Sequence, residues 1–330
     1  MKAIRVRGGQ GPAESLYQGT APVPSLANGE ALIKVKAFGL NRMDIIQRNG
    51  GYVLPPQAPE TLGVEFSGTI AQVESGYGWD IGDEVFGLAY GGAYAEYLAV
   101  STRMLIPKPK DLSWEKAAAI PETWMTATQA MFLVGNFKAG ESILWHAGAS
   151  AVAIAGIQLS RASGASQVFA TTGSDGKVKF CVEELGVTAA FNYKTQPWPD
   201  EVLRSTKDVG VDVIIDLVGA SHFQGNIQAA SRDARIAHLG QVGGTVLPPG
   251  TDIGPMLWKR IHFQGSTLRS RDLDYQSKLK DLFVEHALPK IRDGSFKVHI
   301  EKTFSWTDII EAHKLLEGNT TQGKLVCTID

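Results

Sequence analysis

The sequence lacks the features of several common protein classes. Its two cysteines, Cys181 and Cys327, lie far apart, so neither a disulfide framework nor a cysteine-rich zinc site is expected. The formal net charge is −2 and no basic block occurs, which argues against a dedicated nucleic-acid binder. The run AVAIAGIQL is too short to span a membrane, and the first residues, MKAIRVRGGQGPAESLYQ, lack the apolar core of a secretory signal. We therefore expect a cytoplasmic protein.

The length and the residue pattern predict two domains, because 330 residues are too many for one ordinary core. Residues 113–135 have helical composition, with a break expected at Pro121. From residue 141 short apolar strands alternate with helices, which is typical of βαβ units around a parallel sheet. The last part of the chain resembles the first in composition, so we expect it to return to the first domain. The first part is rich in strand-like segments, namely 31–40, 66–73 and 94–100.

One loop in the middle of the chain has the position of a dinucleotide-binding loop but few of its glycines. The Rossmann fingerprint is G-x-G-x-x-G/A between the first strand and its helix. Here Gly148 supplies the first glycine, Ser150 replaces the second and Ala153 stands at the third. Small side chains still let a phosphate approach the helix N-terminus, where N–H groups and the helix dipole favour an anion. The alternative is a small-residue turn that binds nothing.

The end of the second strand in this series indicates which nicotinamide cofactor is bound. NAD sites place an acidic residue there, on the ribose hydroxyl. This strand ends near Gly173 and Ser174, with Lys177 just beyond, and a hydroxyl with a lysine suits the 2′-phosphate of NADPH better. Asp175 counts against this interpretation, although it lies past the strand. Ser174 also fits a helix N-cap, and the two roles are compatible.

Seven segments occur in order along the chain: LNRMDIIQRNGGY (40–52), LGVEFSG (62–68), AAAIPETWMTA (117–127), HAGAS (146–150), FNYK (191–194), LRSRD (268–272) and QGKLV (322–326). In these segments the sequence resembles the medium-chain dehydrogenase/reductases, specifically the zinc-free quinone oxidoreductases of zeta-crystallin type, and most of all the tumour-suppressor-induced branch. The resemblance implies an α/β fold with a doubly wound parallel Rossmann sheet, 124–267, inserted in a GroES-like twisted β-rich catalytic domain, 1–123 and 268–330. It also implies an active site in the cleft between domains and a homodimer joined through the Rossmann domains.

The same resemblance implies metal-independent hydride transfer from NADPH to a quinone, expected to be an ortho-quinone. Zinc-dependent relatives need a Cys where this chain has Asn41 and a His where it has Val64, so no metal is expected. Asn41 and Tyr52 are implied to face nicotinamide and substrate, with Tyr52 as a hydrogen-bond donor. Asp44 and Gln47 are implied substrate contacts, although Asp44 also fits a capped helix end. The implied cofactor contacts are Thr126, Gly148, Ala149, Ser150, Ala151, Val152, Gly173, Ser174, Lys177, Tyr193, Gly219, Gly240, Gly243, Leu268, Arg269 and Lys324.

Other functions fit the same features. An alkenal or enone reductase would use the same hydride and one oxygen-binding donor. A second alternative is a non-enzymatic role, either in RNA binding, which would need a local basic patch, or as an abundant structural protein. A third is an NADPH-binding sensor with vestigial catalysis. Relatives often carry glycine where this chain has Ala151 and Ala153, so somewhat weaker cofactor binding is expected. His146 is interpreted as an interior histidine and Glu65 as a structural hydrogen-bonding residue.

Overall fold

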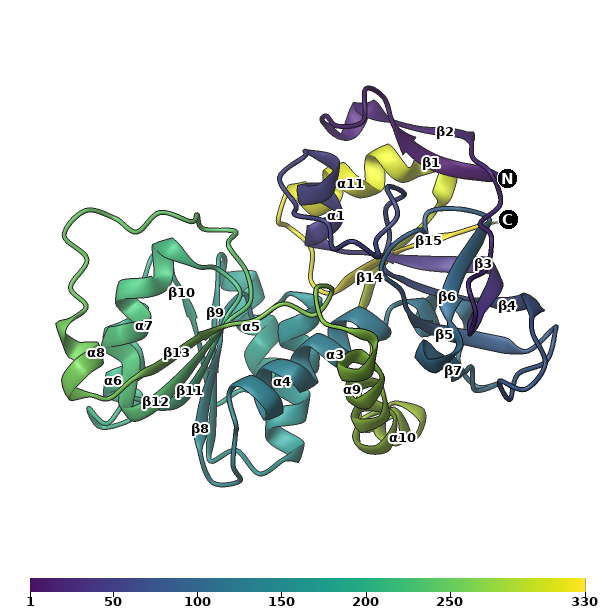
Figure 1. Cartoon of the computed structure of the whole chain (residues 1–330). Coiled ribbons are helices and arrows are strands. Elements are labelled where there is room, and N and C mark those ends of the chain that lie inside the picture. Colours follow the sequence, from purple (N-terminus) through teal and green to yellow (C-terminus); the bar gives the residue numbers. More distant parts are fainter. Residues whose placement is uncertain (330) are drawn as a thin grey trace. The chain divides into compact units, whose positions relative to one another are not determined.

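The computed structural model describes residues 1–329, and the chain divides into two compact units (Figure 1). The first unit comprises Met1–Met125 together with the chain from Arg269 onward, and the second is Thr126–Leu268. The first unit therefore uses both ends of the chain, while the second is continuous in sequence.

The first unit is built on a mainly antiparallel sheet. Its strand order is β14-β15-β3-β4-β5-β7, β6 pairs with β3, and β1 and β2 form a separate hairpin pair. The last strand, β15, pairs antiparallel with β3, which joins the end of the chain to its beginning. The strands are β1 (Lys2–Val6), β2 (Leu16–Thr20), β3 (Glu30–Leu40), β4 (Glu65–Val73), β5 (Glu84–Leu88), β6 (Tyr97–Ser101), β7 (Leu105–Pro107), β14 (Ile300–Ser305) and β15 (Lys324–Thr328).

Helices α2 and α11 pack against this sheet. The Ser113 hydroxyl accepts a hydrogen bond from Lys116 N–H and caps α2, whose Ala118 and Ala119 pack against Ala37 of β3 and Val326 of β15. The predicted break at Pro121 is confirmed, because α2 ends before it and α3 begins with it. The helices are α1 (Arg42–Arg48), α2 (Trp114–Ala118), α9 (Leu273–His286), α10 (Leu288–Arg292), α11 (Ile309–Glu317) and α3 (Pro121–Thr128), whose last residues from Thr126 belong to the second unit.

The second unit contains the predicted parallel sheet, so the expected α/β fold is confirmed. Its six strands run in the order β10-β9-β8-β11-β12-β13, and all five pairings are parallel. The strands are β8 (Ser142–Trp145), β9 (Gln167–Thr172), β10 (Ala189–Asn192), β11 (Val211–Asp216), β12 (Ala230–His238) and β13 (His262–Gly265). The helices are the π-helical turn η3 (Gln129–Val134), α4 (Ala151–Ala162), α5 (Asp175–Glu183), α6 (Trp198–Ser205), α7 (Phe223–Ala229) and α8 (Gly254–Trp258).

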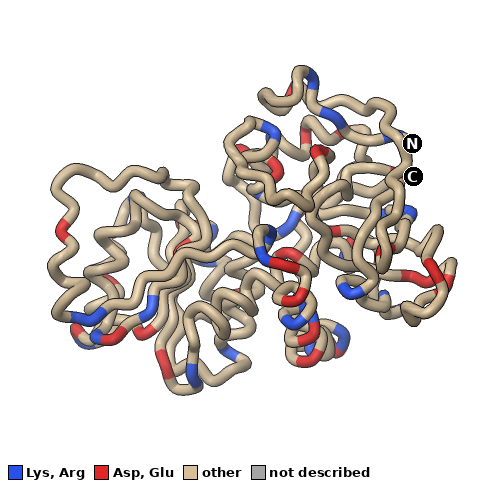
Figure 2. Tube along the Cα trace, viewed as in Figure 1, with Lys and Arg blue, Asp and Glu red and all other residues tan. Residues whose placement is uncertain are grey.

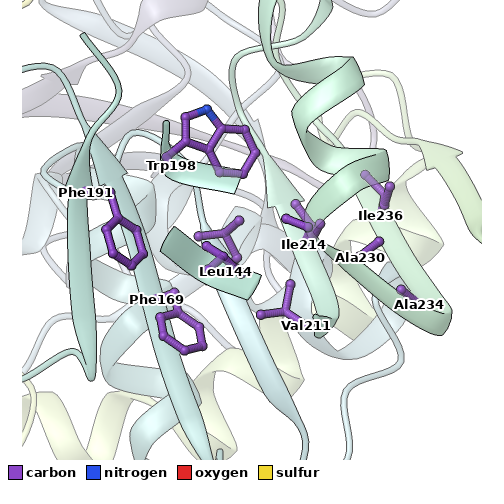
Figure 3. Close-up of a cluster of buried hydrophobic side chains, with 11 residues drawn as sticks. Leu144, Phe169, Phe191, Trp198, Val211, Ile214, Ala230, Ala234 and Ile236 are labelled. Carbon is purple, nitrogen blue, oxygen red and sulfur yellow. The ribbon is translucent and has the colours of Figure 1, made fainter. Parts of the chain in front are cut away.

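One face of this sheet holds a large apolar cluster (Figure 3). Phe169 and Phe191 come from neighbouring strands and stack with their ring centroids 6.3 Å apart, while Trp198 of α6 covers the same face. The cluster anchors the strands from which the predicted cofactor loops project. It comprises Leu144, Phe169, Phe191, Trp198, Val202, Val211, Ile214, Ala229, Ala230, Ala234 and Ile236.

Lys and Arg residues are interspersed with Asp and Glu residues in both units (Figure 2). The segment 239–251, which leads to α8, carries no Lys, Arg, Asp or Glu. Among the described residues, no helix combines the length and the apolar character needed to cross a membrane.

Candidate functional site

Four glycines of the predicted cofactor site lie at one edge of the parallel sheet. The strands β9, β8, β11 and β12 are neighbours in that order and run parallel, so their carboxyl ends share this edge. The loops after these ends carry Gly173, Gly148, Gly219 and Gly240, respectively. Strand order reverses between β8 and β11, and ligands of open α/β sheets bind at such switch points.

The loop after β8 makes a tight turn at Gly148, where there is no room for a side chain. A Cβ on Gly148 would lie 2.7 Å from Ala170 Cβ and 3.0 Å from Cys181 Sγ. Ala147 adopts a left-handed conformation with φ of 52°. The strained turn brings the backbone directly to the N-terminus of α4, as the fingerprint requires.

The two alanines in this loop differ in where they place their methyl groups. Ala153 is fully buried, so its methyl packs into the interior, whereas Ala151 is half-buried at the start of α4. Ser150 caps the helix by accepting a hydrogen bond from Ala153 N–H at 3.3 Å. Since first-turn N–H groups have no partner within a helix, those of Ala151 and Val152 suit an anion.

In the loop after β9, Ser174 caps the following helix and the Asp175 carboxylate is hydrogen-bonded to another strand. Ser174 Oγ accepts from Lys177 N–H at 3.4 Å, which is the capping role considered for it. Asp175 Oδ1 accepts a hydrogen bond from Asn192 Nδ2 at 2.7 Å. Asp175, the residue that counts against a 2′-phosphate site, is thus hydrogen-bonded to the last residue of β10.

A second lysine, which the sequence analysis missed, lies beside the same loop. A Cβ on Gly173 would lie 2.8 Å from Tyr193 Oη and 3.5 Å from Lys194 Cε. The phenol and the lysine stem therefore flank Gly173, and Tyr193 is 40% exposed. The FNYK segment signalled this lysine, since it immediately follows Tyr193 at the end of β10.

The loops after β11 and β12 are held together by glycine backbone. Gly219 has φ of 90°, and a Cβ there would lie 3.0 Å from Gly240 O. Gly243 N–H donates to Val218 O at 2.7 Å. A Cβ on Gly240 would lie 2.5 Å from Leu217 O. These glycines are required for the approach of the two loops to each other.

Two neutral histidines lie close to the carboxyl ends of these strands, His146 directly after β8 and His222 in the turn after β11. Burial lowers the pKa of His146, whose ring nitrogens contact Thr171 Oγ1 at 2.7 Å and Asn226 Oδ1 at 2.6 Å, so the interpretation as an interior histidine is confirmed. Burial lowers the pKa of His222 to about 4. Its Nε2 is buried with no hydrogen-bond partner among residues 1–329, and its ring centroid lies 5.1 Å from that of Tyr193. No sequence pattern pointed to His222.

In the first unit, Asn41 begins α1 directly after β3. Asp44 Oδ2 accepts the Asn41 N–H at 2.7 Å, and Asp44 Oδ1 accepts the Gly63 N–H at 3.2 Å. Burial raises the pKa of Asp44 to about 6, against the opposing hydrogen bond from Asn41. Asp44 therefore caps the helix from a fully buried position.

The Asn41 side chain is held between two buried ions. Its Nδ2 donates to Glu65 Oε1 at 2.9 Å, and its Oδ1 accepts from Lys324 Nζ at 2.5 Å. Glu65 and Lys324 also form an ion pair with each other, and they are 0% and 3% exposed. Gly39 makes room for the pair, because a Cβ there would lie 2.8 Å from Glu65 Cδ and from Lys324 Cε. The prediction that Glu65 is a structural hydrogen-bonding residue is confirmed.

A second polar group joins Tyr52, Gln47 and Arg269. Arg269 Nη1 donates to Gln47 Oε1 at 2.7 Å, Arg269 Nε donates to Tyr90 O at 2.6 Å, and Arg269 Cζ lies 5.3 Å from the Tyr52 ring centroid. Burial raises the pKa of Tyr52, against the opposing charge of Arg269, so the phenol stays a donor at neutral pH. Arg269 is predicted as a cofactor contact, and its side chain also organises this group of the first unit.

Behind Asp44 lies a buried chain of hydrogen bonds that the sequence did not suggest. Arg48 Nη1 lies 3.0 Å from His313 Nδ1, and His313 Nε2 lies 3.2 Å from Tyr94 Oη. Because Arg48 can only donate, His313 accepts at Nδ1 and donates from Nε2 to Tyr94. Tyr94 in turn donates to Asp44 Oδ2 at 3.2 Å. This series of hydrogen bonds joins α1 to α11, two helices from opposite ends of the sequence.

Comparison with known proteins identifies the family. Residues 27–110 match the alcohol dehydrogenase GroES-like domain, and residues 151–285 match the zinc-binding dehydrogenase domain. A mouse quinone oxidoreductase is 32% identical over 331 aligned positions, covering 99% of this chain and 97% of its own. The chain belongs to the medium-chain dehydrogenase/reductases, in the zeta-crystallin-type quinone oxidoreductase branch. It is therefore an oxidoreductase that uses a nicotinamide cofactor.

Two solved structures illustrate the range of this dehydrogenase/reductase family. One is described as an NAD-dependent alcohol dehydrogenase, with 30% identity, a TM-score of 0.86 and full coverage of both chains. The other is a mycobacterial protein complexed with NADPH, with 26% identity, a TM-score of 0.87 and 99% coverage of both chains. Both kinds of nicotinamide cofactor thus occur on this fold.

The zinc named in one family model does not fit this member of the family. Zinc sites use thiolate, imidazole and carboxylate ligands. At Asn41 the donors are one amide and the Glu65 carboxylate, and the Lys324 ammonium already occupies that carboxylate. Within residues 1–329 no group of three or more His, Cys, Asp or Glu side chains is placed to hold a metal ion.

The remaining predicted residues of this oxidoreductase lie mostly inside the second unit. Thr126, on α3, is 9% exposed, and Leu268, after β13, is 8% exposed. Ala149 is buried within the tight turn at 3% exposure. Gln129, the first residue of η3, donates from Nε2 to Thr267 O at 3.3 Å. This hydrogen bond joins the segment before Leu268 to the helical turn that follows α3.

Proposed function

We propose that this protein is an NADPH-dependent quinone reductase that transfers hydride to an ortho-quinone without a metal ion. The observation that carries the proposal is the Asn41 amide, fixed by Glu65 and Lys324 in a buried cluster that offers no thiolate or imidazole ligand. The mouse relative named a quinone oxidoreductase supports the substrate class.

In this proposal, the bound nicotinamide supplies a hydride, and the protein supplies orientation and charge stabilisation. Addition of hydride to a quinone leaves an aromatic oxyanion, which a fixed donor stabilises. Asn41 Nδ2 and the protonated Tyr52 phenol are the donors proposed for that oxygen. A proton from water then completes the hydroquinone, so that one hydride and one proton are added. Asp44 and Gln47 hold these donors through α1 and Arg269, respectively.

The direct experiment offers the purified protein NADPH with an ortho-quinone panel and, separately, with an enone panel. Turnover of the quinones with formation of two-electron hydroquinone products is the expected result. Preferential reduction of the enones at their β carbon would assign the protein to the alternative alkenal or enone reductases. Absence of turnover with both panels would contradict the enzymatic proposal.

The choice of NADPH over NADH is proposed to depend on Lys177 and Lys194 beside Ser174 and Tyr193. Charge-assisted hydrogen bonds contribute about 1.5–3 kcal/mol each, so the Lys177→Ala/Lys194→Ala double variant is expected to raise the NADPH Kd tenfold or more. The NADH Kd should change less than about twofold, because NADH lacks the 2′-phosphate. Nicotinamide fluorescence titration measures both constants.

The control is Lys179→Ala, since Lys179 is an exposed lysine of the same helix, α5. It should leave both Kd values unchanged. An equal loss of affinity for NADPH and NADH in the double variant would contradict the assignment of a 2′-phosphate site.

We also propose a homodimer that forms at the β13 edge of the parallel sheet. β13 ends the strand order, and an unprotected strand edge favours pairing with another chain. Apolar side chains of the segment that leads into β13 are highly exposed: Val246 at 84%, Leu257 at 80% and Trp258 at 62%. Exposed apolar patches of this kind mark interaction sites in soluble proteins.

The Leu257→Glu/Trp258→Glu variant is expected to convert the dimer to a monomer, because it would bury two carboxylates in the interface. Sedimentation equilibrium measures the mass of each form. The control is Val209→Glu, at an apolar position that is 66% exposed before β11. A wild-type protein that is monomeric at micromolar concentration would contradict the proposal.

A further inference from the structure

Lys324, Gly39 and Glu65 meet because three adjacent strands place them side by side. β15 pairs antiparallel with β3 so that Val326 lies opposite Gly39 and Leu325 opposite Leu40. The same register carries Lys324 to the position opposite Asn41. β3 pairs with β4 so that Phe38 lies opposite Phe66, which carries Glu65 to the position opposite Gly39. The cluster is therefore built into the sheet and does not depend on a flexible loop.

The two ions fix the orientation of the Asn41 amide. An amide can bind in two orientations that differ by a 180° flip about its last bond. Here the oxygen faces an ammonium, which only donates, and the nitrogen faces a carboxylate, which accepts. The flipped amide would place its N–H groups against Lys324 and its oxygen against Glu65, so both contacts would become repulsive.

Glu65 is itself held in place, so the orientation is transmitted through a rigid group. Its second oxygen, Oε2, accepts the Glu122 N–H at the start of α3 at 2.9 Å. Lys324 contributes one hydrogen to Glu65 and one to Asn41. Its ammonium is therefore committed to side chains of the first unit and is 3% exposed.

We infer that Lys324 is a positioning residue for Asn41 and not a contact of the cofactor phosphates. Lys324 and Glu65 hold the amide so that its second N–H is directed at the oxyanion of the substrate. This inference rests on the proposed function, because it assigns the oxygen-binding role to Asn41. It replaces the implied role of Lys324 as a basic cofactor contact with a role in the alignment of the donor.

The test compares Lys324→Met with Lys34→Met, whose lysine is exposed on β3 of the same sheet. Lys324→Met leaves Glu65 buried without its counter-ion, so Lys324→Met/Glu65→Gln serves as a second variant with a neutral pair. Three quantities are measured: the NADPH Kd by fluorescence, kcat with an ortho-quinone, and the side-chain amide resonances of Asn41 in asparagine-labelled protein. Asn41→Ser assigns these resonances.

We expect the Asn41 amide resonances to shift and kcat to fall about tenfold to a hundredfold in both Lys324 variants, with an NADPH Kd within about twofold of the wild type. The Lys34→Met control should change none of the three. A tenfold rise in the NADPH Kd, or unchanged Asn41 resonances, would overturn the inference. The resonance and Kd measurements need no turnover, so they decide it even if the wild type reduces no quinone and the proposed function fails.

Discussion

Replacement of Glu65 by alanine is expected to lower the free energy of unfolding by about 3–5 kcal/mol, because it leaves the Lys324 ammonium buried without a counter-ion. Lys324 is 3% exposed, and its other hydrogen bond goes to the neutral Asn41 oxygen. The substitution also removes the acceptor for Asn41 Nδ2 and for the Glu122 N–H. Urea denaturation of both proteins measures the difference.

The matched control is Glu14→Ala in the same unit. Glu14 pairs with Lys314 at 3.0 Å, and the Lys314 side chain that the substitution leaves behind is 43% exposed, so water replaces the lost partner and little or no change in the free energy of unfolding is expected. The double variant Glu65→Ala/Lys324→Met should be more stable than Glu65→Ala alone, because it removes the unpaired charge. A loss below about 1 kcal/mol for Glu65→Ala would show that the ion pair is not buried in solution.

Replacement of Asn41 by alanine is expected to lower kcat for quinone reduction about 100- to 1,000-fold, which is the usual cost of one oxyanion donor. The cofactor Kd should stay within about twofold, because the predicted phosphate contacts lie on other residues. Lys324 and Glu65 keep each other as partners in this variant. Steady-state kinetics with NADPH and with its 4-deuterated form measure the effect, and the isotope effect should increase as hydride transfer becomes slower.

Asn28→Ala is the control, since Asn28 is an exposed asparagine of the same unit. It should leave kcat unchanged. A normal kcat in Asn41→Ala, with the variant as stable as the wild type, would transfer the donor role to Tyr52 alone. The comparison with Tyr52→Phe then shows whether the phenol acts independently of the amide.

Much of the candidate cofactor site follows from local sequence. Strand-to-helix alternation from residue 141 and glycines shortly after β8, β9, β11 and β12 predict where these loops emerge, because parallel strands align their carboxyl ends. The capping roles of Asp44 and Ser174 were also accessible, because a cap depends only on a few neighbouring residues.

Contacts between distant residues were not accessible in the same way. Lys324 and Asn41 are 283 residues apart, Arg269 and Gln47 are 222 apart, and Tyr94 and His313 are 219 apart. No periodicity relates such pairs, since they meet only through sheet register and helix packing. His222 was missed for the same reason, because it becomes relevant only once its neighbours across the sheet are known. Lys194 was within reach of the sequence, since it is the last residue of the FNYK segment.

By itself the sequence determined the fold class, the family and the positions of the glycine turns, because these depend on short-range pattern and on backbone conformations that few residues adopt. Only the tertiary structure decided how the charges are used. Tertiary packing forms the Lys324–Glu65 ion pair around the Asn41 amide. It also places the Arg269 guanidinium over the Tyr52 ring and the Asp175 carboxylate within hydrogen-bond distance of Asn192. The physical reason is that a buried charge must find a partner, and the three-dimensional packing determines which partner lies within reach.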